Sequence, residues 1–374
     1  LFHYFPGYTA YDDAAWEVYQ AVNAQFGAVV GALAEPGDCI WIHDYHFLLL
    51  PQLLRPRLPD ASIGFFLHIP FPTYEMYRML PSFWRTAMLR GLLGADLIGF
   101  HTPDDAEYFR TCVARLLGGE IDGETVRVDG RTTAVRDFPI SIDVERYAEA
   151  PAAPEVQAEV GQLQERLADQ KAIISIDRLD YSKGIYQRLL GYQTFLAEHP
   201  RWHGRVTFIL VVVPSRIGVD QYQRLRQQID ETVGHINGQY GSVHWTPIIY
   251  QYRSLPFASL SALYALGDVA LITPLRDGMN LVCKEYVAAR ANQDGVLILS
   301  EMAGAAHELT SALLINPNNR REVAGAIAAA LAMPAAEQAE RMAAMQAQLR
   351  ANDVRKWAVD FLLALGEPVA QAAE

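Results

Sequence analysis

The chain has 374 residues, of which 51% are hydrophobic and 20% charged, a globular composition with room for two domains. The formal net charge of −12 argues against nucleic acid as a partner, because a phosphate-backbone site normally carries a basic cluster. No apolar run reaches the roughly 18–20 residues that span a bilayer, so no membrane partner is expected. Residues 1–30 lack a signal-peptide pattern, and three widely spaced cysteines favour reduced thiols and a cytoplasmic location.

The first part of the chain alternates short apolar strands with amphipathic helices. Strands are predicted at 39–42, 62–67 and 97–100, a hairpin around Asp129-Gly130, and helices at 14–33, at 47–54 and after Thr102. A doubly wound domain normally begins with a strand and a turn. Because a helix comes first here, we expect the first domain to be incomplete at its N-terminus.

An alanine–proline run at 151–154 suggests a boundary between domains 1–150 and 151–350, and the alternation restarts after it. Strands are predicted at 172–176, 206–213, 245–250, 269–272 and 296–299, and helices at 155–168, 183–198, 220–236 and 324–349. Such alternation predicts mostly parallel sheets with helices on both faces. The expected fold class is therefore α/β, with two Rossmann-like doubly wound domains facing a cleft.

The segment 274–286 (PLRDGMNLVCKEY) carries the most specific chemical signal. A turn at Asp277-Gly278 follows a strand, and a helix is expected to begin near Asn280 or Leu281, where free backbone N–H groups can bind an anion. Glu285 is expected about two helical turns beyond Asp277, roughly 12 Å along the axis, a span that suits one ligand with sugar and ribose ends. The alternative is a plain strand–turn–helix joint, which the combination of these side chains disfavours.

A second segment, 177–184 (DRLDYSKG), directly follows a predicted strand. Ligands of open α/β sheets bind at such strand ends, and Arg178 and Lys183 are cations able to hold a diphosphate. The segment lacks P-loop spacing. A surface loop with ion pairs among Asp177, Arg178 and Asp180 remains an alternative.

Histidines and an arginine follow other predicted strands. His43 and His46 have no further ligand at metal spacing, so no metal site is expected, and one of them can equally be a core histidine. His68 is the stronger candidate, because the two prolines in 67–72 (LHIPFP) stiffen its loop. Arg216 closes the strand 206–213, where it is either a third ligand cation or a surface residue. The chain has no GxGxxG, GxSxG or HExxH motif.

These strings resemble the trehalose-6-phosphate synthase family of retaining glycosyltransferases over nearly the whole chain. The resemblance rests on His3-Tyr4 and on the segments 41–46 (WIHDYH), 64–72 (GFFLHIPFP), 177–184, 274–286 and 303–306 (AGAA). It implies the GT-B architecture, with an acceptor domain at 1–150 and a nucleotide-sugar domain at 151–350. It also implies that the last segment, 351–374, is a helix returning to the first domain.

The resemblance implies a role for each matching residue on the donor side. Arg178 and Lys183 would bind the diphosphate of UDP-glucose and stabilise the leaving group, and Asp277 would hold hydroxyls of the donor glucose. His68 would contact the donor sugar and Glu285 the ribose. Backbone support would come from Gly278, Met279, Asn280, Leu281 and Val282.

On the acceptor side, the resemblance implies that Asp44 holds glucose 6-phosphate and Arg216 its phosphate. Together with the donor roles, this makes Asp44, His68, Arg178, Lys183 and Asp277 the expected catalytic set. The family is metal-independent and needs no cofactor beyond its substrates. A front-face mechanism is usual, in which the leaving phosphate helps to deprotonate the acceptor.

The sequence is compatible with several alternatives. A related enzyme could use another acceptor, as glucosylglycerol-phosphate synthases and pseudo-glycosyltransferases do, or the chain could be a non-catalytic regulatory homologue. The family's N-terminal glycine loop and phosphate-binding arginine are expected before Leu1, and no C-terminal phosphatase domain is expected within the chain. Whether a homo-oligomer forms is also open.

Overall fold

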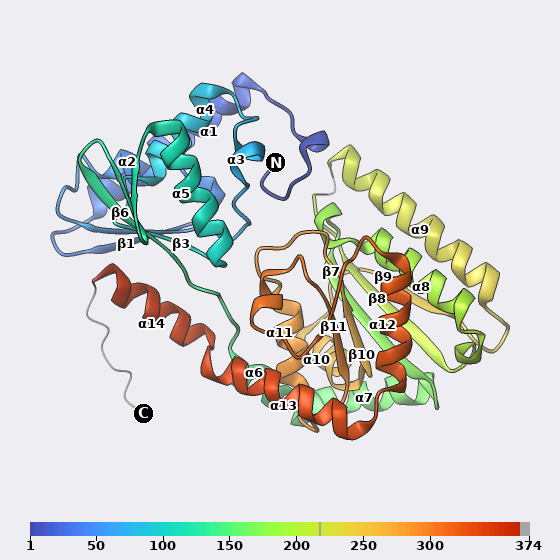
Figure 1. The fold of residues 1–374 in the computed structure, drawn as a ribbon. Helices are drawn as coiled ribbons and strands as arrows, with labels where there is room; N and C mark the ends of the chain where they lie inside the picture. Colours follow the sequence, from blue (N-terminus) through green and yellow to red (C-terminus); the bar gives the residue numbers. More distant parts are fainter. Residues whose placement is uncertain (217, 367–374) are drawn as a thin grey trace. The chain divides into compact units, whose positions relative to one another are not determined.

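The computed structural model describes residues 1–216 and 218–366 and divides into two compact units (Figure 1). Unit 1 comprises Leu1–Ile140 together with the described residues 355–366, and unit 2 comprises Ser141–Val354. The division thus falls at 140–141 and 354–355, where the sequence suggested 150–151 and 350–351. The reason is that the alanine–proline run begins in the short helix η3 (Ala150–Ala152), whose Ala150 and Pro151 are buried inside unit 2.

Unit 1 is built on a six-stranded sheet of order β1-β2-β3-β6-β5-β4. Its strands are β1 (Cys39–His43), β2 (Ser62–Phe66), β3 (Leu97–Phe100), β4 (Glu120–Asp122), β5 (Thr125–Val128) and β6 (Arg131–Asp137). Its helices are α1 (Asp13–Leu33), α2 (Leu50–Leu54), α3 (Tyr74–Tyr77), α4 (Ser82–Leu92), α5 (Pro103–Leu117) and α14 (Val354–Leu365). The pairs β1–β2, β2–β3 and β3–β6 are parallel, so the carboxyl ends of β1, β2 and β3 share one edge.

The two faces of this sheet have separate apolar cores, as the two-residue repeat of a strand dictates. In β2, Ile63 and Phe65 belong to the larger cluster with residues of α1, α2, α4 and α5. Phe66 belongs to the second cluster with Phe361 and Leu365 of α14. The ring of Phe361 stacks on Trp41 with centroids 4.4 Å apart, so α14 completes the core of unit 1.

Unit 2 contains a fully parallel six-stranded sheet. Its strands are β7 (Lys171–Arg178), β8 (Val206–Val213), β9 (Ile248–Tyr252), β10 (Val269–Ile272), β11 (Val296–Ser300) and β12 (Leu313–Ile315). Its α-helices are α6 (Val144–Glu149), α7 (Pro154–Leu167), α8 (Ile185–Glu198), α9 (Asp220–Tyr240), α10 (Phe257–Leu266), α11 (Leu281–Ala289), α12 (Arg320–Ala332) and α13 (Ala335–Ala351).

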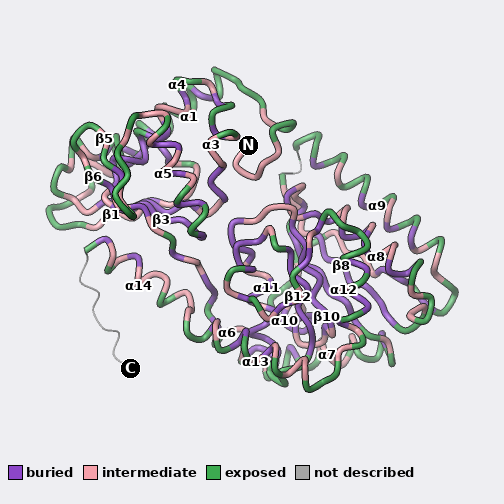
Figure 2. The backbone as a smooth tube through the Cα atoms, viewed as in Figure 1, coloured by how far each residue is buried: buried purple, intermediate pink, exposed green. Residues whose placement is uncertain are grey.

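The strand order of unit 2 is β12-β11-β10-β7-β8-β9, which is the doubly wound order of a dinucleotide-binding fold. Helix α8 packs with α9 and α12, while α10 packs with α7 and α11. The central strands β7, β8, β10 and β11 are mostly buried (Figure 2). The winding reverses between β7 and β10. Ligands of such sheets bind at the carboxyl ends of the strands at this reversal.

The α/β class predicted from the alternation is thus confirmed for both units. None of the helices in the described ranges combines the length and the apolar character that a bilayer crossing requires.

Candidate functional site

The reversal point of unit 2 brings together the two segments singled out in the sequence. Arg178 is the last residue of β7, and the short helix η4 (Tyr181–Lys183) follows it. Asp277 lies in the loop after β10, the strand next to β7. Among the described residues Arg178 has no ion-pair partner, and it is exposed at this edge.

Lys183 and Asp277 meet directly across the reversal. The Lys183 ammonium donates to Asp277 Oδ2 at 2.5 Å, and the side chains are 14% and 13% exposed. Burial lowers the pKa of Lys183, but the Asp277 and Asp177 carboxylates outweigh it and leave the pKa above its ordinary value. The lysine is therefore a fixed positive charge at this edge of the sheet.

The start of α11 stands beside this pair, as the sequence predicted. Asn280 caps the helix by accepting from the Cys283 N–H at 3.1 Å, and its amide donates to Asp277 Oδ2 at 3.0 Å. Its φ of 79° is rare for a residue other than glycine and is typical of strained functional loops. The helix begins at Leu281, directly after its cap Asn280, which is the start that the sequence predicted.

A second loop, after β11, holds the Asp277 turn through backbone hydrogen bonds. Gly304 N donates to Asp277 O at 3.2 Å, and Ala305 N donates to Met279 O at 2.9 Å. A Cβ on Gly304 would lie 2.0 Å from Gly278 O, so only glycine permits this approach. The segment 303–306 thus supports the backbone of 277–279.

Arg188 is a buried residue of this region that the sequence analysis missed. Its side chain has no exposed area and pairs with Asp177 at 2.6 Å. The guanidinium also donates to Thr273 Oγ1 at 3.0 Å, to Lys183 O at 3.0 Å and to Ser175. It therefore ties β7, the end of β10 and the Lys183 turn together, and Asp177 pairs with it instead of with Arg178. No local motif marks a residue inside a helix for such a role.

Glu285 is held by tyrosines in the body of unit 2. Tyr264 of α10 donates from its hydroxyl to Glu285 Oε2 at 2.6 Å. Tyr147 of α6 also faces Glu285. Burial together with the Glu285 charge raises the pKa of Tyr147 to about 12. These hydroxyls stay protonated and can orient the carboxylate.

Arg216 follows β8, the other neighbour of β7. It is exposed and has a φ of 47°. Its Nη1 donates to the hydroxyl of Tyr222 at 2.9 Å. The side chain is therefore tethered at the same carboxyl edge as Arg178.

Unit 1 has its own cluster at the carboxyl edge of its sheet. His43 Nδ1 and His68 Nε2 are 3.0 Å apart. His101 directly follows β3, and its ring centroid lies 5.5 Å from the ring centroid of His68. The sequence analysis also missed His101, although it stands at the carboxyl end of a strand, as His43 and His68 do. Burial lowers the pKa of His43 and of His68, so both rings favour the neutral form.

Asp44 lies beside this cluster in a strained conformation. Its φ is 71°, and its Oδ1 accepts from the backbone N–H of His68 at 3.4 Å. Asp44 and His68 therefore lie together in unit 1, while the remaining predicted site residues belong to unit 2. In the described ranges, no group of three histidine, cysteine, aspartate or glutamate side chains could hold a metal ion.

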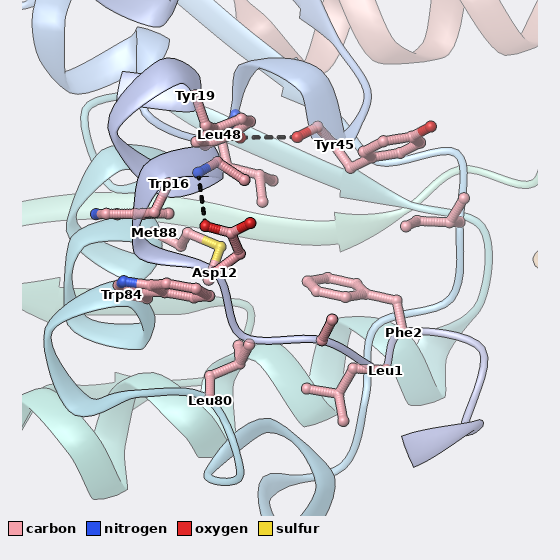
Figure 3. A pocket seen from close by; sticks show the side chains of 13 residues that line it. Leu1, Phe2, Asp12, Trp16, Tyr19, Tyr45, Leu48, Leu80, Trp84 and Met88 are labelled. Atoms are coloured by element: carbon pink, nitrogen blue, oxygen red, sulfur yellow. Dashed lines mark hydrogen bonds between the residues drawn. The ribbon is translucent and has the colours of Figure 1, made fainter. Parts of the chain in front are cut away.

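A separate apolar pocket of about 310 Å³ lies in unit 1 beside α1 and α4 (Figure 3). Trp16 and Trp84 stack along it with ring centroids 5.2 Å apart. The Asp12 carboxylate in its lining accepts from the N–H groups of Ala14 and Ala15 at the start of α1. That carboxylate serves a helix cap, so we assign the pocket no part in the charged site.

Comparison with known proteins places this architecture in a family. The model of glycosyltransferase family 20 matches residues 1–367. The chain belongs to this family, and the family predicted from the sequence is confirmed.

Individual relatives are similar over almost the whole chain. A bifunctional trehalose-6-phosphate synthase/phosphatase from Thermoproteus tenax is 49% identical over 98% of this chain, which spans 50% of the length of that relative. A solved structure of a UDP-forming α,α-trehalose-phosphate synthase from Burkholderia xenovorans, in complex with glucose-6-phosphate, is 37% identical, with a TM-score of 0.94 over 98% of this chain and 80% of that one. A solved structure of trehalose-6-phosphate from E. coli, bound with UDP-2-fluoro glucose, is 39% identical, with a TM-score of 0.95 over 98% and 82% of the two chains.

Proposed function

We propose that this protein transfers glucose from UDP-glucose to glucose 6-phosphate and forms trehalose 6-phosphate with retention of the anomeric configuration. The observation that carries the proposal is the cluster of Arg178, Lys183 and Asp277 at the reversal of a doubly wound sheet. Cations at such a point suit a diphosphate. The substrates named for the Burkholderia and E. coli structures support this choice of donor and acceptor.

In the proposed reaction, the bond between the glucose C1 and the diphosphate oxygen breaks while C1 bonds to the acceptor hydroxyl. The hydroxyl proton passes to the departing phosphate oxygen. Arg178 and Lys183 meet the charge that develops on the leaving diphosphate, where fixed charges act most strongly. Asp277 binds hydroxyls of the donor glucose, Glu285 binds the ribose, and the backbone of 278–282 lines the donor.

We assign the acceptor to the remaining predicted residues. Asp44 would hold hydroxyls of glucose 6-phosphate, and Arg216 would bind its phosphate. His68 would contact the donor glucose. Its hydrogen bond with His43 favours one tautomer, which fixes the atom that His68 presents to a ligand.

We propose that no metal ion takes part, because two side-chain cations already stand where the diphosphate charge needs them. Turnover that is unchanged by EDTA would support this, and turnover restored only by a divalent cation would contradict it. We also propose a cytoplasmic location, in keeping with the free thiols of Cys39, Cys112 and Cys283. Cell fractionation with an antibody against the protein would check the location.

The decisive experiment is an acceptor panel with UDP-glucose as donor. Release of UDP and formation of a phosphorylated disaccharide are expected with glucose 6-phosphate. Faster turnover with glycerol 3-phosphate would reassign the acceptor. If none of the sugar phosphates in the panel causes release of UDP, the transferase assignment is refuted.

A further inference from the structure

Tyr222, the third residue of α9, connects two charged residues at the carboxyl edge of unit 2. The residue is 3% exposed. Its hydroxyl donates to Asp180 Oδ2 at 2.9 Å and accepts from Arg216 Nη1 at 2.9 Å. One hydroxyl therefore bridges the loop after β7 and the residue that follows β8.

Asp180 extends this connection to the Lys183 turn. Its second oxygen, Oδ1, accepts from Ser182 N at 2.9 Å and so caps η4. Its carbonyl accepts from Lys183 N at 3.1 Å. The same residue thus shapes the turn that presents Lys183 to Asp277 and, through Tyr222, holds Arg216.

The direction of the hydrogen bonds in this chain is fixed by its chemistry. A guanidinium can only donate and an ionised carboxylate can only accept. Burial and the Asp180 charge raise the pKa of Tyr222, so its hydroxyl keeps the proton that it donates. Both bonds involve a charged partner, which makes each stronger than a bond between neutral groups.

The contacts with Tyr222 restrict the side chain of Arg216. It is exposed, and its φ of 47° places a non-glycine residue in the left-handed region, which costs backbone energy. A free arginine side chain carries about 2 kcal/mol of rotamer entropy that a ligand would otherwise have to overcome. The guanidinium also lies over the Tyr222 ring, 5.6 Å from its centroid, so ring and hydroxyl both restrict it.

A buried tyrosine hydroxyl needs only one partner to be satisfied. Tyr192, in the core of the same unit, shows this simpler case, because its hydroxyl donates only to Pro247 O at 3.1 Å. Tyr222 instead joins two charged side chains. Packing alone does not require that arrangement.

We propose that Tyr222 and Asp180 are positioning residues that hold Arg216 ready for the phosphate of the acceptor and connect it to the Lys183 turn. This inference rests on the proposed function, in which Arg216 binds that phosphate. Neither positioning residue touches the substrate. Their effect is on how tightly the phosphorylated acceptor binds.

The test is the direct binding of glucose 6-phosphate to Tyr222→Phe, measured by calorimetry on the full chain saturated with UDP. This change removes one oxygen atom and keeps the ring. The affinity for glucose 6-phosphate is expected to fall about 10-fold, the scale of a hydrogen bond to a charged group. The affinity for UDP should change less than about threefold. Tyr192→Phe is the matched control and should leave both affinities unchanged.

A double-mutant cycle separates positioning from a general effect on structure. In an Arg216→Ala background, Tyr222→Phe should cause no further loss of glucose 6-phosphate affinity, because it acts through Arg216. Equal losses in both backgrounds would overturn the inference, as would wild-type affinity in Tyr222→Phe.

Failure of the proposed function gives a different pattern. An unaltered protein that binds neither UDP nor glucose 6-phosphate would overturn the function and this inference together. An unaltered protein that binds both, with a Tyr222→Phe variant that does the same, would overturn this inference alone.

Discussion

Lys183 is a fixed charge whose ammonium is paired with Asp277 in a largely buried site, so its replacement is read in both kcat and stability. Lys183→Met keeps most of the side-chain length but removes the ammonium. Because the proposed leaving group gains charge as the reaction proceeds, kcat should fall on the order of 100- to 1000-fold. Asp277 keeps its bond from the Asn280 amide at 3.0 Å but loses its counter-charge in a site where it is 13% exposed, so the melting temperature should also fall, and kcat is compared well below it. Steady-state kinetics and a thermal melt on the same preparation give both quantities.

Lys171 offers the matched control for that change. It also pairs with an aspartate, Asp268, at 2.6 Å, but at the start of β7, at the other end of the strand. Lys171→Met removes a lysine–aspartate pair of the same unit without touching the proposed site, so kcat should stay near its original value. An equal loss of kcat in both variants would mean that the pairs act through stability rather than chemistry.

His43 and His68 predict a pH dependence of stability in unit 1. Burial lowers both pKa values, so below about pH 6.5 the unfolded chain binds more protons than the folded chain. Their contribution to stability is therefore complete above about pH 6.5 and is lost as the pH falls. Each unit of pKa depression corresponds to about 1.4 kcal/mol.

His43→Gln should therefore make the melting temperature depend less steeply on pH between about 7 and 5. Tryptophan fluorescence can follow this unfolding, because Trp41 lies 4.7 Å from His43 between ring centroids. His235→Gln changes an exposed histidine of α9 and should keep the original slope. Parallel slopes in all three proteins would show that the histidine pair is not responsible.

The packing of α14 on the unit 1 sheet depends on small residues beneath it. A Cβ on Gly64 would lie 2.7 Å from Phe361 Cε1 and 3.0 Å from Leu365 Cδ2. Gly64→Ala should therefore overpack this core and cost about 1–3 kcal/mol of unfolding free energy. Denaturant titration measures the cost directly.

A glycine in an open position gives the opposite expectation. Gly161, in the middle of α7, has no atom within 4 Å of an added Cβ. Gly161→Ala should stabilise the protein by up to about 1 kcal/mol, because alanine is the better helix former. A loss of stability at Gly161 as large as that at Gly64 would argue against the packing explanation.

The elements that sequence patterns predicted best are those with a strong local signal. The cap at Thr102, which accepts from Asp105 N at 3.2 Å, and the buried strand β8 both form where they were expected. Strand β9 lies at Ile248–Tyr252 rather than at 245–250, because Trp245 instead closes a turn through Ser242. The alanine-rich helix expected at 324–349 divides into α12 and α13, because Met333-Pro334 ends the first and caps the second.

The candidate site followed the same rule. Lys183, Asp277 and Asn280 could be predicted because they stand in the short connections that follow strands β7 and β10, where sequence position fixes the location in the fold. Arg188 and Tyr222 could not, since each lies inside a helix and gains its role from partners distant in the sequence or across a loop. Thr273 accepts a hydrogen bond from Arg188, yet nothing in its local sequence distinguishes it from a threonine of the core.

At the level of the two units, the proposed donor site should be separable from the reaction. The residues assigned to UDP lie in Ser141–Val354, which has its own sheet and its own apolar core. Residues 141–354 produced alone should therefore fold cooperatively and bind UDP within about tenfold of the affinity of the full chain. They should transfer no glucose, because Asp44 and His68 belong to unit 1.

Calorimetry with UDP and a transferase assay on the isolated segment test both halves of this prediction. Lys183→Met in the same segment should weaken UDP binding, which would show that the affinity comes from the assigned residues and not from an incidental surface. Turnover by the isolated segment would remove Asp44 and His68 from the mechanism. A folded segment with no affinity for UDP would instead mean that unit 1 contributes to the donor site, and the assignment of the donor to unit 2 alone would fail.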